Sequence, residues 1–150
     1  MARGDLLDGI RGNGISTFGG NPLATAAGNA TLDYVLSHDL QRNAAVTGRL
    51  IIDGLQEAAT TLDIVGDVRG KGLMFAVDLV DPETNKPSPP LAARMLEATK
   101  ERGLLVGKGG LYGHTLRMAP PLTLTEAEAK EGLTNLTDAL TAVNEETKTK

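Results

Sequence analysis

The stretch between Ile64 and Val80 constrains the fold of this 150-residue chain more than any other part of it. It contains two runs rich in apolar and β-branched residues, one on either side of the glycine-containing sequence Gly70-Lys71-Gly72. Two such runs joined by a short glycine turn are typical of an antiparallel β-hairpin. We therefore expect a pair of antiparallel strands here, around which the other elements must pack.

Helical patterns precede and follow this hairpin, because apolar residues recur at spacings of three and four on both sides of it. The expected helices cover residues 22–36, 40–62, 91–102 and 125–144, and further short strands are expected at 104–106 and 115–118. The last helix opens with Thr125 and Glu128 at the spacing of a capping box, and residues 145–150 are expected to fray. The predicted fold is α/β, a two-layer small domain with short, mostly antiparallel strands covered by helices.

Composition excludes several classes of function. The formal net charge is −4, from 15 Lys and Arg against 19 Asp and Glu, and no basic stripe is visible, so no nucleic-acid partner is expected. The chain has no cysteine, and its two histidines lack ligand partners at metal-binding spacing, so no metal site is expected. No apolar run approaches the roughly 18 residues of a membrane span, and the first residues do not lead into the apolar core of a signal peptide. We expect a soluble, cytoplasmic protein without a membrane partner.

The segment from Ser16 to Pro22 has the composition of an anion-binding site. Two hydroxyl residues and two glycines stand before a helix start, where Asn21 can cap and Pro22 suits the first helical position. Hydroxyls, glycines and a helix N-terminus together suit a phosphate. The alternative is an ordinary capped helix that follows a flexible loop, and the residues alone leave both readings open.

Several other polar residues stand at positions where either a structural or a functional role is possible. Arg69 and Arg117 occupy strand positions flanked by apolar residues, so each either has its head in water or is directed at a carboxylate. Asp78, near a strand end, is expected to be solvated. His38 is expected to face solvent or cap a helix. His114 lies in a glycine loop near Arg117, and it either has no function or belongs to a functional site.

Two Gly-Lys pairs invite comparison with nucleotide-binding loops. The segments that end in Gly70-Lys71 and Gly107-Lys108 each have one residue too few between their glycines, and each lysine is followed by Gly. Because the phosphate-binding loop of nucleoside triphosphatases needs both the spacing and a following Ser or Thr, that function is excluded.

Three blocks, in this order and at these distances, together resemble the C-terminal portion of the class III aminotransferases, which are pyridoxal-phosphate enzymes. The blocks are Ser16-Thr17-Phe18-Gly19-Gly20-Asn21-Pro22-Leu23, Val68-Arg69-Gly70-Lys71-Gly72-Leu73 and Leu116-Arg117-Met118-Ala119-Pro120-Pro121-Leu122. The resemblance extends from about Ile15 into the last helix, and the glycine loop at 107–113 looks most like alanine-glyoxylate-type members. It implies the C-terminal domain of a fold-type I enzyme, with residues 1–37 as the tail of the large cofactor domain plus a connecting helix and 38–150 as the small domain.

The resemblance also implies roles for single residues. Thr17 matches the threonine that reaches the cofactor phosphate of the other subunit of a homodimer, with Ser16 contributing nearby. Arg117 matches the arginine that binds the substrate α-carboxylate in many members, which suits the planar guanidinium. The implied reaction transfers an amino group between a small-molecule amino acid and an oxo acid, with pyridoxal 5'-phosphate as cofactor.

One departure from the family pattern limits what this chain can do. The lysine that forms the cofactor Schiff base lies upstream of the Thr17 block in the family, and counting back from Thr17 runs off the chain. The chain does contain lysines, but their sequence surroundings differ from those of the Schiff-base lysine, so they cannot replace it. They include Lys71, Lys86, Lys100 and Lys108. We therefore expect a C-terminal fragment with no catalytic residue of its own, inactive as isolated. The alternatives are a non-catalytic dimerisation or regulatory module of the same fold, and a stand-alone phosphate-binding domain.

Overall fold

The computed structural model describes residues 4–9, 12 and 14–149. The chain divides into two compact units, Met1–His38 and Asp39–Lys150. The first unit contains helices α1 (Gly4–Leu7) and α2 (Pro22–Ser37), and no α2 residue is buried. All the buried hydrophobic residues that the structure describes belong to the second unit.

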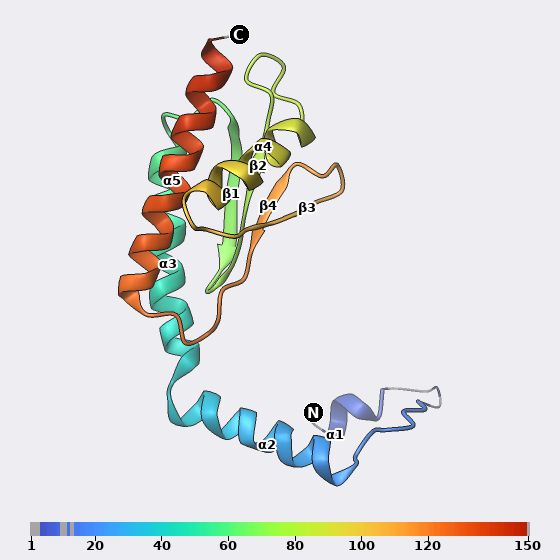
Figure 1. The fold of residues 1–150 in the computed structure, drawn as a ribbon. Coiled ribbons are helices and arrows are strands. Elements are labelled where there is room, and N and C mark those ends of the chain that lie inside the picture. The colour runs from blue at the N-terminus through green and yellow to red at the C-terminus, as the bar shows by residue number, and fades with distance from the viewer. Residues whose placement is uncertain (1–3, 10–11, 13, 150) are drawn as a thin grey trace. The chain divides into compact units, whose positions relative to one another are not determined.

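The second unit is a four-stranded antiparallel sheet with helices on one face (Figure 1). Its strands are β1 (Val65–Lys71), β2 (Met74–Leu79), β3 (Gly107–Gly109) and β4 (Thr115–Met118), in the spatial order β1-β2-β4-β3. Its helices are α3 (Leu40–Ala59), α4 (Pro89–Glu101) and α5 (Glu126–Lys148). This architecture confirms the predicted α/β fold with short antiparallel strands covered by helices.

The two faces of the sheet differ because side chains alternate along each strand. On β2, Phe75, Val77 and Leu79 are buried beneath the helices, whereas Met74 on the opposite face is 70% exposed. The largest fully buried side chains come from helices, strands and the segment before β1: Leu55, Ile64, Leu79, Met95, Leu116 and Leu140. The face that the helices do not cover is called the open face below.

The predicted hairpin is confirmed, and its turn consists of Gly72 and Leu73, with Lys71 paired to Met74. The predicted capping box is also confirmed. The Thr125 side chain accepts a hydrogen bond from the Glu128 backbone N–H, and the Glu128 carboxylate accepts one from the Thr125 N–H at 2.8 Å. No helix among the residues described is both long enough and apolar enough to cross a membrane.

The predicted strand at 104–106 is wrong, because β3 forms from Gly107–Gly109 within the expected glycine loop. The reason is the end of α4. Gly103 has φ of +75°, its N–H donates to the Lys100 carbonyl, and the Leu104 N–H donates to the Thr99 carbonyl at 2.9 Å. This is a Schellman arrangement, and it ties the backbone of Leu104 to the helix instead of to the sheet.

Three helix boundaries differ from the expected ones by two residues or more. Helix α4 begins at Pro89 rather than 91, because proline suits the first turn of a helix. Helix α3 ends at Ala59, three residues before the predicted end. Helix α5 continues to Lys148, where fraying was expected, and the Lys148 ammonium lies 3.0 Å from the Glu145 carboxylate one turn earlier. Such a pair supports the last turn of a helix.

Candidate functional site

Two of the sequence-predicted arginines lie in one row on the open face of the sheet. The strand register pairs Arg69 of β1 with Ala76 of β2, and Ala76 in turn with Arg117 of β4. A shallow cavity of about 680 Å³ covers this row, and its lining includes Arg69, Lys71, Met74, Ala76, Thr115 and Arg117. The hairpin and the β2–β4 pairing therefore bring together two arginines that are far apart in the sequence.

Arg69 is neutralised by two carboxylates. Its Nη1 and Nη2 atoms donate to the two oxygens of Asp78 at 2.6 and 3.0 Å, and Nη1 also donates to Asp67 at 2.8 Å. These hydrogen bonds, the Asp78 pair first among them, raise the pKa of Arg69 above its ordinary value. Of the two readings left open for Arg69, the structure therefore selects the carboxylate partner.

Asp78 is the centre of this network, so the expectation that it is solvated is wrong. Its side chain is 19% exposed, and besides Arg69 it accepts a hydrogen bond of 2.6 Å from the Thr115 hydroxyl. The His114 Nε2 atom lies 3.7 Å from its Oδ2 atom. Burial raises the pKa of Asp78, but the Arg69 and Thr115 hydrogen bonds and the Arg69 charge outweigh it, so its pKa lies below the ordinary value.

The ring of His114 completes one side of the network. It is 12% exposed, and its Nδ1 atom is buried without a hydrogen-bond partner among the described residues. His38, by contrast, lies at the end of α2, where its ring stacks on Tyr34 at 4.0 Å and its backbone N–H donates to the Tyr34 carbonyl. The predicted capping position of His38 is therefore confirmed.

The lowered pKa of Asp78 predicts a pH dependence of stability. A carboxylate whose pKa falls on folding stabilises the fold above its unfolded pKa, and this contribution disappears as the pH falls through the folded pKa. We expect the free energy of unfolding of the unaltered chain to exceed that of Asp78→Asn near pH 6, and the difference to shrink below about pH 3.8. Urea unfolding at several pH values measures this. Asp138→Asn, at an exposed position on α5, controls for the loss of one formal charge. A difference that stays constant from pH 6 to pH 2 would contradict it.

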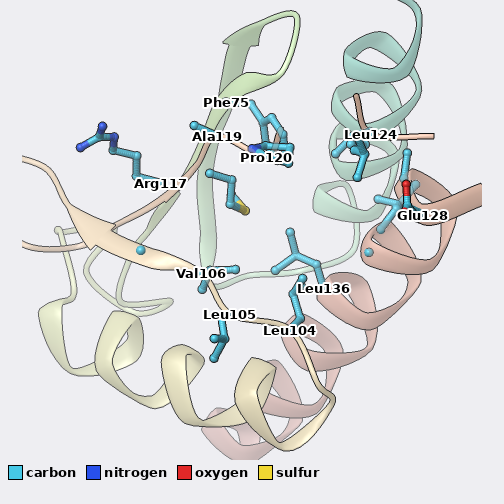
Figure 2. Close-up of a pocket in the computed structure, with 16 residues that line it drawn as sticks. Phe75, Leu104, Leu105, Val106, Arg117, Ala119, Pro120, Leu124, Glu128 and Leu136 are labelled. Atoms are coloured by element: carbon cyan, nitrogen blue, oxygen red, sulfur yellow. The ribbon is translucent and has the colours of Figure 1, made fainter. Parts of the chain in front are cut away.

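Arg117 differs from Arg69 because no described residue forms a hydrogen bond or ion pair with its guanidinium. Its neighbours across the sheet are Ala76 on β2 and Gly107 on β3, both too small to cover it. Figure 2 shows its side chain extending away from the apolar side chains below the sheet. An accessible guanidinium with free donors is suited to bidentate binding of a carboxylate.

Behind the sheet, those apolar side chains line a second cavity of about 370 Å³, which sequence reasoning did not predict (Figure 2). Leu104 and Val106 line it from the segment before β3, and Leu133 and Leu136 from α5. Its lining is mainly aliphatic, and the charged residues among those that line it are Arg117 and Glu128. Among the described residues no group of three potential metal ligands was found in any location.

Ser16 and Thr17 lie together in the first unit, next to the start of α2. The Gly19 N–H donates to the Ser16 carbonyl at 3.0 Å, and Asn21 caps α2 by accepting from the Ala24 N–H at 2.9 Å, which confirms the predicted cap. Both hydroxyl residues are exposed, and neither hydroxyl has a partner among the described residues. A Cβ at Gly19 would lie 2.8 Å from the Ser16 Oγ. The Ser16 hydroxyl therefore lies against the backbone of Gly19, where a larger side chain would clash with it. This donor set fits a phosphate group.

The Asp78 network is what sequence reasoning missed. A signal for it was present, since side chains alternate along a hairpin and the register Val68↔Val77 puts Arg69 and Asp78 on the same face. Ser16 and Thr17 belong to the first unit, and Arg117 belongs to the second.

Comparison with known proteins places the chain in a family. The family model described as aminotransferase class-III matches residues 4–140. The chain is 35% identical to the alanine/serine racemase of Pyrococcus horikoshii over 89% of its own length and 28% of the relative's. It is 40% identical to the alanine–glyoxylate aminotransferase 2 homolog 2, mitochondrial, of Arabidopsis thaliana over 76% of its own length and 24% of the relative's.

Solved structures agree with this assignment. A phospholyase from Arthrobacter in complex with phosphoethanolamine superimposes with a TM-score of 0.82 at 34% identity, covering 93% of this chain and 34% of the phospholyase. The chain thus spans between about a quarter and a third of the length of these relatives. Because the match covers nearly the whole chain in sequence and in fold, the chain belongs to the class-III aminotransferase family.

Proposed function

We propose that the chain is the C-terminal part of a pyridoxal-phosphate-dependent aminotransferase that moves an amino group between an amino acid and an oxo acid. The observation that carries this proposal is Arg117, an exposed guanidinium that has no carboxylate partner among the described residues and is flanked by Ala76 and Gly107. In this role Arg117 clamps the α-carboxylate of the substrate and orients it. The match to the family supports the aminotransferase class, and the named reactions of the relatives include racemisation as well as amino transfer.

The cofactor that the family implies is pyridoxal 5'-phosphate, which when bound supplies an electron sink for chemistry at the α-carbon. In our proposal Thr17, with Ser16 beside it, donates hydrogen bonds to the phosphate of a cofactor held mainly by the partner subunit of a homodimer. The two hydroxyls, which have no partner in the part of the chain that the structure describes, and the open backbone at Gly19 support that role. Residues 1–37 then belong to the large cofactor domain and its connecting helix, residues 38–150 form the small domain, and the enzyme is cytoplasmic.

The carboxylate clamp is tested by titrating the 150-residue chain with glutaramate, which carries a single carboxylate, and following backbone amides by NMR. We expect shifts around Ala76, Gly107 and Arg117. Arg117→Met should weaken binding at least about threefold, which is the scale of an exposed charged pair. Arg117→Lys should weaken it too, because an ammonium keeps the charge but loses the bidentate geometry.

The matched control for this titration is Arg94→Met, because Arg94 already donates two hydrogen bonds to Glu146 at 2.9 and 2.6 Å. Binding by this variant should equal that of the unaltered chain. Equal affinities of the Arg117→Met variant and the unaltered chain would overturn the clamp.

The proposal that this chain holds no catalytic lysine has a separate test. We expect incubation with pyridoxal phosphate and reduction with borohydride to label the lysines of the chain slowly and without preference, and no amino transfer to be detected. Peptide mapping by mass spectrometry reads the distribution of the label. Stoichiometric labelling of one lysine would show that the chain anchors the cofactor itself.

A non-catalytic dimerisation module of the same fold is the second candidate, and the exposed apolar residues of the first unit favour it. Ile15 is 91% exposed, Phe18 83% and Leu23 82%. Apolar groups exposed to this extent favour association with another surface. A module needs no substrate clamp, so self-association without any glutaramate binding at Arg117 would favour this candidate over the enzyme.

A further inference from the structure

We propose that Asp78 is a specificity-determining residue of the Arg117 site. By neutralising Arg69, it leaves Arg117 as the guanidinium available to a ligand in the open-face cavity, so that the cavity selects a ligand with one carboxylate at this end over a ligand with two. This inference rests on the proposed role of Arg117, and it assigns a function to the Asp78 network that the clamp alone does not require.

The two arginines are placed so that one ligand could engage both. Arg69 and Arg117 occupy the same row on either side of Ala76, and both line the cavity. Because neighbouring strands lie about 4.8 Å apart, their Cα atoms are separated by about 10 Å, and long side chains can shorten the distance between the guanidiniums. Ala76 between them is too small to separate two bound groups. With both guanidiniums free, the row would suit a short dicarboxylate.

Asp78 prevents a second ligand carboxylate from binding Arg69 more effectively than Asp67 does. Asp78 accepts from both terminal nitrogens of Arg69, at 2.6 and 3.0 Å, and its side chain is 19% exposed. Asp67 accepts one hydrogen bond, and its side chain is 54% exposed. Bidentate pairs shielded from water are the stronger ones, whereas exposed pairs contribute little.

Neighbouring side chains hold Asp78 in this position. The Thr115 hydroxyl donates to its Oδ1 atom at 2.6 Å, and the His114 ring lies beside its Oδ2 atom. The carboxylate is therefore fixed toward Arg69 from two sides. Lys71 also lines the cavity, but it is exposed near the hairpin turn, and its compact ammonium cannot form the bidentate pair that a guanidinium forms.

The test compares two probes of equal length in titrations of the 150-residue chain followed by NMR. Glutarate carries two carboxylates, and glutaramate carries one carboxylate and one amide. We expect the unaltered chain to bind glutaramate more tightly than glutarate, because the second carboxylate of glutarate meets an Arg69 that Asp78 already neutralises. Asp78→Asn keeps the shape and can still accept from Thr115, and it should bind glutarate about threefold to fivefold tighter while its affinity for glutaramate stays the same.

Matched variants separate selectivity from structural damage. Asp67→Asn removes the same charge from the same arginine at the exposed position, so its gain for glutarate should be smaller. Asp78→Glu should restore the selectivity of the unaltered chain. Adding Arg69→Met to Asp78→Asn should abolish the gain, since Arg69 is the group that Asp78→Asn releases. A merely destabilised protein would lose affinity for both probes and would not gain it for one.

The inference fails if Asp78→Asn, with a native circular dichroism spectrum, leaves the ratio of the two affinities unchanged, or if its gain survives Arg69→Met. The proposed clamp is judged separately, by Arg117→Met with glutaramate. The two failures are distinguishable. The inference is tested by the ratio of the affinities for the two probes, whereas the clamp is tested by the affinity for glutaramate alone.

Discussion

Replacing Gly48 by alanine is expected to lower the free energy of unfolding by about 3 kcal/mol or more, although alanine is the better helix former. Gly48 is buried in α3, where the helix crosses the hairpin turn. A Cβ at this position would lie 2.2 Å from the backbone oxygen of Gly72. The turn cannot yield easily, because Gly72 itself has φ of +58°, a conformation that side chains disfavour. Urea unfolding followed by circular dichroism measures the loss.

Gly132→Ala is the matched control, since Gly132 also lies within a long helix, α5. A Cβ at Gly132 would meet nothing within 4 Å. Without a clash, only helix propensity counts, and we expect stabilisation by roughly 0.5–1 kcal/mol. Equal changes at the two glycines would contradict the proposed contact between α3 and the turn.

Leu140→Ala is expected to cost about 2–5 kcal/mol of the free energy of unfolding. Leu140 is 1% exposed and packs into the core between α5 and the sheet. Truncation removes buried methyl groups and leaves a cavity that the surrounding helices fill only in part. Leu111→Ala is the control, because Leu111 is 89% exposed and its truncation should change stability by less than about 0.5 kcal/mol. Chemical denaturation measures the free energy of unfolding of both variants. A loss of stability in Leu140→Ala no larger than that in Leu111→Ala would contradict the placement of Leu140 in the core.

Elements with a local cause were predictable from the sequence. The hairpin depends on two β-rich runs and a glycine turn, and the start of α5 depends on the capping box of Thr125 and Glu128. The cap at Asn21 and the following Pro22 likewise lie within a few residues of each other. Each of these signals is complete in a short window, so no knowledge of distant residues is needed.

Elements that depend on competition between partners were not predictable. Leu104 lies in an apolar run typical of a strand, but in the Schellman arrangement at Gly103 its backbone N–H donates to the Thr99 carbonyl of α4 and not to the sheet. The strand order β1-β2-β4-β3 also depends on pairing between segments separated by α4, which periodicity does not report. The roles of Ser16, Thr17 and Arg117 are predictions that came from the resemblance of whole blocks to a family.

The sequence by itself determined the class of the fold, its hairpin, most of its helices and the family, because those properties follow from local patterns and contiguous motifs. Only the tertiary structure decided which arginine is available to a ligand. Arg69 and Arg117 have similar sequence surroundings, and both lie on the open face of the sheet. Asp78 and Asp67 reach Arg69, while Ala76 and Gly107 leave Arg117 uncovered. Whether a charge is neutralised depends on atoms brought within about 3 Å by strand pairing, and that distance exists only in the folded chain.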